Sequence, residues 1–352
     1  MKPATTTIMN NKVLLALSGG VDSSVALSIL QKQGYEVEAL CIKMSDKHNK
    51  TVAAAEKAAA HLSVKLHIVS AEELFSSVVI KNFAEKYLSG KTPNPCIICN
   101  PLVKFRVLYD FAMKHGFKKI ATGHYAKISE LGGKKYISPA KNLQKDQSYM
   151  LYRLPEEIIN HLLFPLGDIE DKNAIRNMAT DENMPSANSP DSQEICFIEN
   201  ENYADFIERN FGRCKRGLFV GPKGENLGKN KGIINYTIGQ RKGLGIAYSE
   251  PIFVKKIDAE SGNVFLCRSG EEFFSKVILE DVFFPHPLEN NDFSADVKIR
   301  YSAKTAKADI SVSENTATVV FTTPQRACCP GQSVVFYNDG VVLGGGFIKE
   351  SV

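Results

Sequence analysis

A short loop rich in glycine and serine has the residue types of a phosphate-binding site. It reads Ser18-Gly19-Gly20-Val21-Asp22-Ser23-Ser24 and lies between an expected strand and an expected helix. Its glycines let backbone N–H groups approach an anion, and the helix N-terminus adds further amides. Asp22 would repel a phosphate unless a divalent cation lay between them, which favours magnesium-bridged pyrophosphate leaving from ATP. The alternative is a plain Ser-Gly-Gly turn capped by Asp22.

Cysteines provide the second group of residues with chemical potential. Cys96 and Cys99 form a C-x-x-C pair, which we expect in a tight turn before a helix. A helix N-terminus lowers the pKa of a thiol and raises its thiolate fraction. A reactive pair or single nucleophile is favoured over a buried structural pair. Zinc is disfavoured because the sequence has no second C-x-x-C. Cys196 stands between Ile195 and Phe197, a setting that by itself favours a small core residue.

Taken together, the motifs point to one family. The loop alone resembles the PP-loop of ATP pyrophosphatases, enzymes that split ATP into AMP and pyrophosphate while adenylating an acceptor. The ordered set resembles the tRNA-specific 2-thiouridylase family over nearly the whole chain. The matching motifs, in chain order, are SGGVDSS, TPNPCIICN, ATGHYA, KDQSYMLY, D-S-x-x-I-C-F-I, IGQRKGLGI, Arg300-Tyr301 and PGQSVVFYNDGVVLGGG.

This resemblance implies a reaction and its partners. The family adenylates the C2 oxygen of wobble uridine (U34) in tRNA with ATP, and a cysteine persulfide then delivers sulfur to C2. Adenylation is needed because an amide-like oxygen is a poor leaving group. The implied cofactors are ATP and Mg²⁺. The implied partners are tRNAs for Lys, Glu and Gln and a sulfur-donor protein, such as a cysteine desulfurase or a relay protein, with no membrane.

The resemblance also implies roles for individual residues. Cys196 matches the persulfide carrier, and Cys99 matches the nucleophile that attacks the persulfide and ends in a Cys99–Cys196 disulfide. Asp22 is the candidate metal contact, through Mg-pyrophosphate. The expected ATP contacts are Ala16, Leu17, Ser18, Gly19, Gly20, Val21, Asp22, Ser23, Ile42 and Gly123. The expected target-base contacts are Asn94, Pro95 and Cys96. The expected tRNA contacts are His124, Lys145, Asp146, Gln147, Arg300, Tyr301 and Gln332.

Two positions depart from the family pattern, and two others have plainer interpretations. Many members carry Asp at the position of Cys96 as a general acid/base; here a thiol with a lowered pKa, water or another group would take that role. Residues 43–50 lack an acidic insertion that some relatives have, which leaves the sulfur donor open. His124 could simply donate to a nearby carbonyl. The segment Gly239–Gly245 is either a flexible basic loop or a contact to RNA.

The elements that must position these residues follow from the apolar pattern. Strands alternating with helices over the first 125 residues predict a parallel sheet with helices on both faces, and ligands at the carboxyl ends of its strands. A hairpin is expected at Gly132-Gly133, then helices around 155–163 and 172–178. From Phe283, period-two patterns predict an antiparallel barrel or sandwich. We expect strands at 13–17, 36–43, 64–69 and 119–122, and helices at 22–33, 53–62, 72–88 and 102–115.

The fold class is therefore α/β, and three domains are expected. They are a PP-loop domain similar to the adenine-nucleotide alpha hydrolases (1–209), a small basic central domain (210–275) and a C-terminal β-barrel (276–352). Between Asp205 and Gly245, nine Lys and Arg face three acidic residues, so this segment holds a net +6 while the whole chain is only +4. Such a concentration is either a solvated surface or an electrostatic footprint for a phosphate backbone.

Composition excludes several classes of protein. The 352 residues are 43% hydrophobic and 23% charged, which is ordinary for globular domains. No apolar run approaches the roughly 20 residues of a membrane span, and the first ten residues have no export-signal pattern. Eight cysteines without such a signal predict reduced thiols and a cytoplasmic location.

Two other functions remain as alternatives. One is a PP-loop adenylating ligase with a small amine acceptor, which would not need cysteines. The other is a non-catalytic RNA-binding protein with a vestigial nucleotide site, which would not consume ATP.

Overall fold

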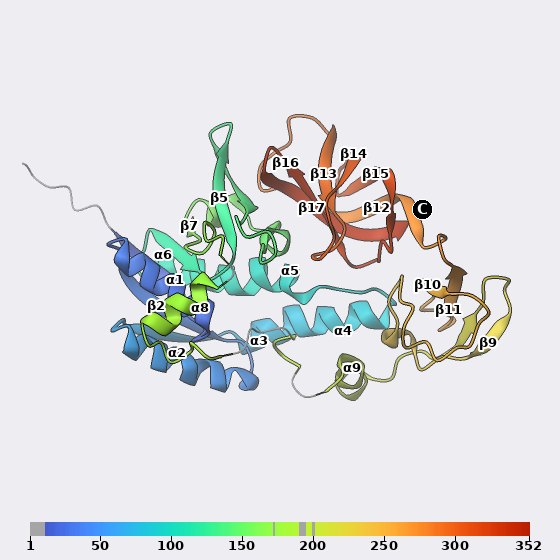
Figure 1. The fold of residues 1–352 in the computed structure, drawn as a ribbon, viewed down its shortest axis with the longest axis horizontal. Coiled ribbons are helices and arrows are strands. Elements are labelled where there is room, and N and C mark those ends of the chain that lie inside the picture. The colour runs from blue at the N-terminus through green and yellow to red at the C-terminus, as the bar shows by residue number, and fades with distance from the viewer. Residues whose placement is uncertain (1–10, 172, 190–194, 199–200) are drawn as a thin grey trace, which may run out of the picture. The chain divides into compact units, whose positions relative to one another are not determined.

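The structure is a computed structural model that describes residues 11–171, 173–189, 195–198 and 201–352. Contacts divide the chain into two compact units, residues 1–76 with 99–193 and residues 77–98 with 194–352. The first unit carries the parallel sheet, and the second carries a small sheet and a barrel (Figure 1). The first ten residues, in which the sequence shows no export-signal pattern, lie outside the described residues.

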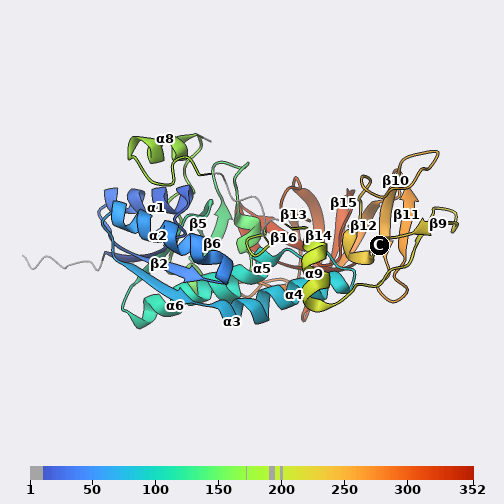
Figure 2. The same ribbon diagram turned by 90° about the horizontal axis from the view of Figure 1, so that it is seen from below.

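A parallel sheet with helices on both faces forms the first unit, which confirms the expected α/β layer. Its strand order is β3-β2-β1-β4-β7, and every neighbouring pair is parallel. Helices α1 and α2 cover one face and α6 covers the other (Figure 2). The bounds are β1 Lys12–Ala16, β2 Glu36–Lys43, β3 Leu66–Ser70, β4 Lys119–Thr122, β7 Leu162–Leu163, α1 Val21–Lys32, α2 Asn49–His61 and α6 Phe105–Lys114.

The central strand shows why these residues form a sheet buried on both faces. Val13 and Leu15 pack into the same core as Val25 and Ala26 of α1. The intervening Leu14 is fully buried as well. A continuous apolar strand of this kind is typical of parallel sheets covered by helices on both sides.

The expected turn around the C-x-x-C pair is wrong, because this segment is helical. Helix α5 spans Pro95–Cys99, and a π-helical turn, Asn100–Lys104, joins it to α6. Pro95 is tolerated because the first helical position needs no N–H donor. Pro101 lacks the N–H that a regular α-helix would use, and the wider π-helical turn occurs at this proline.

The remaining helices and the hairpin of the first unit follow the sheet. The hairpin β5–β6 pairs Leu131 with Lys134, and Gly132 and Gly133 have φ of 57° and 74°. Two central residues with positive φ fit a two-residue turn, which confirms the expected hairpin. The bounds are β5 Ala126–Leu131, β6 Lys134–Pro139, a 3₁₀ turn Ser148–Leu151, α7 Glu156–Ile159 and α8 Ala174–Asp181.

A helical segment connects the sheet to the second unit. Residues 72–88 are helical, as expected, but a π-helical turn separates α3 from α4. The bounds are α3 Glu72–Phe75, the π-helical turn Ser76–Ile80, α4 Lys81–Leu88 and α9 Tyr203–Phe211.

The second unit contains two β structures. The small sheet has the order β10-β11-β8-β9, and the larger one closes into a six-stranded antiparallel barrel, β12-β15-β14-β13-β16-β17. This barrel confirms the period-two prediction. The bounds are β8 Leu218–Val220, β9 Asn226–Lys229, β10 Ile252–Ile257, β11 Val264–Arg268, β12 Phe273–Phe283, β13 Asp292–Lys298, β14 Ala306–Ser313, β15 Thr316–Arg326, β16 Ser333–Asn338 and β17 Val341–Ser351.

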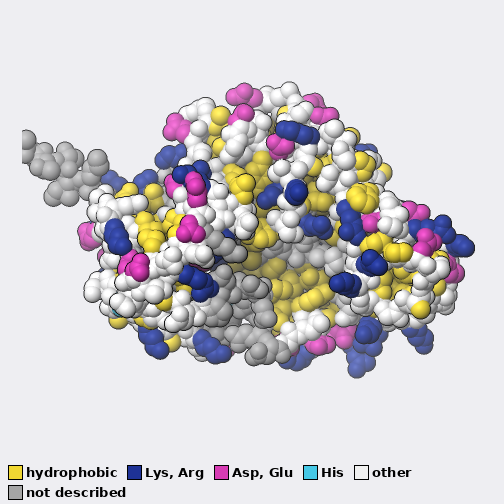
Figure 3. All heavy atoms as spheres, in the orientation of Figure 1, with side chains coloured by type: hydrophobic (Ala, Val, Ile, Leu, Met, Phe, Trp, Pro, Cys, Tyr) yellow, Lys and Arg dark blue, Asp and Glu magenta, His cyan; other side chains and the backbone are white. Residues whose placement is uncertain are grey.

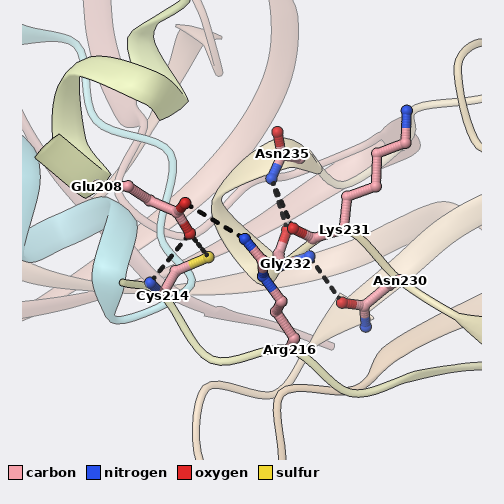
Figure 4. A network of polar contacts seen from close by, with 7 residues as sticks. All are labelled: Glu208, Cys214, Arg216, Asn230, Lys231, Gly232 and Asn235. Carbon is pink, nitrogen blue, oxygen red and sulfur yellow. Dashed lines mark hydrogen bonds and ion pairs between the residues drawn. The ribbon is translucent and has the colours of Figure 1, made fainter. Parts of the chain in front are cut away.

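A polar network joins α9 to the small sheet's domain (Figure 4). Glu208 accepts hydrogen bonds from the backbone N–H and the Sγ of Cys214, at 3.3 and 3.1 Å, and forms an ion pair with Arg216 at 3.4 Å. Gly232 has a φ of 113°, and a Cβ there would lie 2.3 Å from the Cys214 Sγ. The network therefore requires glycine at this position and uses Cys214 as a structural thiol.

Among the described residues, no helix combines the length and apolar character needed to cross a membrane.

Candidate nucleotide and thiol site

The PP-loop lies at the carboxyl end of β1, where ligands bind in sheets of this kind. Serine side chains hold its shape. The Ser23 hydroxyl donates to the Gly20 carbonyl at 3.1 Å and accepts from the Ser18 N–H at 3.3 Å, and the Ser24 hydroxyl donates to the same carbonyl at 2.9 Å. The first turn of α1 follows directly, and a first turn leaves its N–H groups without partners inside the helix.

Three glycines define how closely the backbone packs around this loop. Gly19 has a φ of 74°, and a Cβ there would lie 2.3 Å from the Ala54 carbonyl carbon. At Gly123 a Cβ would lie 2.8 Å from the Ser23 nitrogen. Gly20 differs, because the nearest non-neighbouring atom to its Cβ would be the Ser18 Oγ at 3.5 Å. The loop thus packs tightly against α2 and the end of β4, while a Cβ at Gly20 would make only an ordinary van der Waals contact.

Tyr125 connects Asp22 of the PP-loop to Lys145, a link that the sequence analysis missed. The Tyr125 hydroxyl donates to the Asp22 carboxylate at 2.5 Å. The Lys145 ammonium lies 3.3 Å from the same hydroxyl and 4.9 Å from the centre of the ring. Tyr125 itself is 4% exposed. Its place in the ATGHYA motif was the available signal, but only folding reveals its partners.

The loop that contains Lys145 is shaped by its own polar groups. The buried Asp146 accepts hydrogen bonds from the N–H groups of Ala140 and Ser148, both at 3.1 Å, and from the Ser148 hydroxyl at 2.7 Å. The Gln147 side chain accepts from the Tyr125 N–H at 2.9 Å. Asp146 therefore stabilises the conformation of this loop. Contact of residues 145–147 with tRNA stays a prediction.

His124 is a half-buried, uncharged histidine. Its Nδ1 lies 2.7 Å from the Thr122 hydroxyl, and its ring packs on Phe105 with centroids 5.3 Å apart. Burial, with a smaller effect from Lys104, lowers the pKa of His124 well below its ordinary value. It is therefore suited to hydrogen bonding and stacking, and is not a cation for phosphate.

The two cysteines of α5 have different surroundings. Cys96 is exposed in the first turn, where the Asn94 side chain accepts a hydrogen bond from its N–H at 3.1 Å and caps the helix. Cys99 is 6% exposed, and its Sγ lies 3.9 Å from the Met44 sulfur. The capped helix end orients the segment Asn94–Cys96 that we expect to contact the target base.

Cys196 is exposed on a short turn of the second unit. The Ile198 N–H donates to the Ile195 carbonyl at 2.9 Å. Phe197 is buried and packs against Phe83 and Phe206, with ring centroids 5.3 and 5.8 Å apart. The aromatic anchor thus holds the turn, and the idea of a core cysteine is wrong. Residues 191–194 of the surrounding motif lie outside the described residues.

The other five cysteines are buried structural thiols. Burial raises the pKa of Cys41 and of Cys267 to about 11, and that of Cys328 and of Cys329 to about 12; burial and then the Glu208 hydrogen bond raise that of Cys214. Such thiols stay protonated and unreactive at neutral pH. Over the described ranges, no group of three or more His, Cys, Asp or Glu residues could hold a metal.

The remaining expected contacts lie in and around the barrel. Arg300 is exposed and Tyr301 half-buried after β13. Gln332 donates to the Thr92 carbonyl at 2.7 Å, and the Thr92 N–H donates to the Pro330 carbonyl at 2.8 Å. Gln332 therefore anchors the segment that leads into Asn94. Ile42 and Leu17 are buried within the first unit.

Comparison with known proteins covers almost the whole chain. Three family models match: a tRNA methyl transferase HUP domain over residues 11–200, a tRNA methyl transferase PRC-barrel domain over 204–268, and an aminomethyltransferase beta-barrel domain over 274–348. Among solved structures, the NMN synthetase from Francisella tularensis is similar at 17% identity and a TM-score of 0.35, over 52% of this chain and 67% of that one.

The most informative matches are curated proteins of similar length. The tRNA-specific 2-thiouridylase MnmA of Clostridioides difficile is 40% identical over 98% of this chain and 99% of its own. The protein of the same name from Acetivibrio thermocellus is 42% identical over 96% and 99%. The chain belongs to the tRNA-specific 2-thiouridylase family.

Proposed function

We propose that this protein is an ATP-dependent tRNA-uridine 2-sulfurtransferase that thiolates U34. The observation that carries the proposal is about 40% identity to tRNA-specific 2-thiouridylases over nearly the full length of both chains. The PP-loop geometry supports it, and so does the exposure of Cys96 and Cys196 while the other cysteines are buried. We further propose domain limits at 1–209, 210–275 and 276–352, and a cytoplasmic location.

The residues of the PP-loop suit ATP. Unpaired amides at the start of α1 and the uncrowded backbone of Gly20 offer a cradle for phosphate, and Ala16–Ser23, Ile42 and Gly123 would line it. Mg²⁺, when bound, would neutralise the pyrophosphate as it leaves. Asp22 would be its contact on this chain, and the hydrogen bond from the Tyr125 hydroxyl to one of its carboxylate oxygens would fix the orientation of the group. Lys145 adds a positive charge beside that pair.

The sulfur chemistry requires two thiols with different tasks. The uridine C2 oxygen first attacks the α-phosphate of ATP, and pyrophosphate leaves. The terminal sulfur of a Cys196 persulfide then attacks C2 and displaces AMP. Cys99 next attacks the Cys196 sulfur; this breaks the sulfur–sulfur bond, releases 2-thiouridine and leaves a Cys99–Cys196 disulfide. A dithiol reductant must reduce this disulfide, and a sulfur-donor protein must reload Cys196, before the next cycle.

Proton transfer and substrate recognition complete the proposal. Cys96 is exposed in the first turn of α5, where a bound base could reach it, so we assign to it the acid/base role that Asp has in many relatives. Asn94–Cys96 would contact the base. The tRNA, for Lys, Glu or Gln, would contact His124, Lys145, Gln147, Arg300, Tyr301 and Gln332, with Asp146 acting through the loop that it supports.

One assay tests the reaction. Protein, ATP, Mg²⁺, a sulfide source and unmodified bulk tRNA are incubated, and the nucleosides are analysed by mass. We expect 2-thiouridine to form only with ATP. Because the matching domain models are named after methyl transfer, a parallel incubation with S-adenosylmethionine provides the contrast. A methylated uridine without 2-thiouridine would refute the proposal.

Cysteine variants separate the steps. Cys196→Ser should abolish 2-thiouridine while tRNA binding and pyrophosphate release persist. Cys214→Ser is the matched control, because this thiol is structural and its pKa is raised. Thiolation that survives in Cys196→Ser would exclude the persulfide role. Activity unaffected by any thiol change would favour an amine-accepting ligase.

A further inference from the structure

A groove in the second unit combines positive charge with an exposed aromatic ring. It has a volume of about 750 Å³, and its lining includes Arg241, Lys242, Arg326 and Phe273. We propose that this groove binds an unpaired nucleotide of the tRNA, with the two phosphates that flank it on Arg241 and Lys242 and the base on Phe273. The proposal rests on the proposed function, because it takes the ligand to be tRNA.

The loop that carries the two cations is held in place by the fold. The Gly239 N–H donates to the Val254 carbonyl at 2.7 Å, and the Val254 N–H donates to the Gln240 carbonyl at 3.0 Å. The Gln240 side chain donates to the Lys242 carbonyl at 3.0 Å. Gly239 has a φ of 82°, and a Cβ there would lie 2.3 Å from the Cβ of Ala327. The backbone is therefore preorganised, which lowers the entropy cost of binding.

The charges in the groove leave two cations available. Glu272 is 2% exposed and accepts a hydrogen bond from the Arg326 Nε at 3.1 Å. The Arg326 guanidinium also lies 4.9 Å from the centre of the Phe253 ring. Arg241 and Lys242 are exposed, and within the described part of the chain their side chains form no ion pair or hydrogen bond. Arg326 and Glu272 neutralise each other, so the groove keeps a net charge of two from Arg241 and Lys242.

Phe273 supplies the flat apolar surface. Its side chain is 46% exposed, whereas the next residue, Phe274, is 8% exposed and packs in the barrel core. Phe273 pairs with Arg326 across β12 and β15, at the edge of the groove. An exposed ring beside unpaired cations is the combination by which proteins bind single-stranded nucleotides, since every base has a face for stacking. Figure 3 shows several further Lys and Arg side chains around the domain of β8–β11, which overlaps the segment 205–245 with its net charge of +6.

Equilibrium binding of unmodified tRNA across a series of salt concentrations tests the groove. Arg241→Ala/Lys242→Ala should weaken binding and flatten the slope of log affinity against log salt by about 1.4 to 1.8, the change expected for two lost phosphate contacts. Phe273→Ala should lower affinity by about 5- to 100-fold and leave the slope unchanged, because stacking releases no counterions. Arg326 is unsuitable for this test, since its removal would leave Glu272 buried without its partner.

The control is Lys223→Ala/Lys229→Ala, which removes two exposed cations from the β8–β9 hairpin of the same domain. Equal flattening in this control would overturn the groove, because net charge alone would explain both results. If the groove variants bind tRNA as tightly as the wild type, and the wild type thiolates tRNA, the role of the groove would be refuted and the proposed function would stand. A wild type that binds no tRNA would overturn both.

Discussion

Replacing Gly123 with alanine should disable the ATP-dependent step without unfolding the protein. The new Cβ would lie 2.8 Å from the Ser23 nitrogen and 2.9 Å from the Asp22 carbonyl carbon. Both are backbone atoms in the first turn of α1, so they cannot rotate away as a side chain would. An ordinary contact begins at 3.4 Å, so opening the gap from 2.8 to 3.4 Å moves the PP-loop and β4 apart by 0.6 Å.

This displacement sets the expected size of the effect. Inserting a methyl group into a well-packed site costs about 1–3 kcal/mol of stability. Misplacing reacting groups by about 1 Å can cost on the order of 100-fold in rate. We therefore expect kcat/KM for tRNA-dependent pyrophosphate release to fall about 10- to 100-fold, with a lower but cooperative melting transition. Coupled detection of pyrophosphate, together with circular dichroism, measures both effects.

Gly20→Ala is the matched control in the same loop. Its backbone has an ordinary φ of −76°, and its Cβ would lie no closer than 3.5 Å to a non-neighbouring atom of the protein. Its melting temperature should match the wild type, so that any loss of ATP affinity comes from crowding of the ligand. If Gly123→Ala released pyrophosphate within threefold of the wild type, the tight contact between β4 and the PP-loop would not position the reaction.

Three further predictions concern single side chains. Tyr125→Phe removes a hydrogen bond to Asp22 worth about 1.5–3 kcal/mol; the melting temperature should fall by several degrees with the transition still cooperative, and pyrophosphate release should fall about 10- to 100-fold. An unchanged rate would show that this bond does not position Asp22. At pH 8, iodoacetamide should leave Cys328 and Cys329 unmodified by mass until the protein is unfolded, because burial raises the pKa of each to about 12; labelling as fast as that of the exposed thiols would contradict their burial. Burial acts to raise the pKa of Glu182, but hydrogen bonds from two α1 side chains outweigh it and hold the pKa below the ordinary 4.5. The stabilisation from this carboxylate is therefore present above about pH 4.5 and lost as the pH falls through the lowered pKa. Glu182→Gln should have a lower melting temperature than the wild type at pH 7, and the two melting temperatures should converge in acid. A difference in melting temperature that stays constant with pH would refute the linkage.

Local patterns in the sequence were sufficient for much of the fold. The strand Glu36–Lys43 and the strand Lys119–Thr122 have the bounds expected from their apolar runs. The hairpin at Gly132-Gly133 and the closed barrel also follow from local signals, namely paired glycines and period-two alternation. These features depend on residues near each other in the chain, which is why the sequence alone reveals them.

The segment around Pro95 shows where local signals mislead. Two prolines and an asparagine are typical of a turn, yet Asn94 caps a helix, and a π-helical turn contains Pro101. Proline has the same φ in a turn and in the first turn of a helix, so its presence could not distinguish the two. Whether this segment forms a turn or a helix depends on the burial of the residues that follow it, and Val103 and Phe105 are fully buried.

By itself, the sequence determined the family, the α/β and barrel architecture and the identity of the PP-loop and its cysteines, because motifs and periodicity are carried by order along the chain. Only the tertiary structure decided which polar groups meet. Tyr125 reaches Asp22 across 103 positions of sequence. The pairing of β12 with β15 places Phe273 opposite Arg326, and hydrogen bonds to Val254 of β10 hold the loop of Arg241 in the same groove. It also decided which thiols are buried and protonated. Contact and burial depend on distances between residues remote in the chain, and only the folded backbone sets these distances.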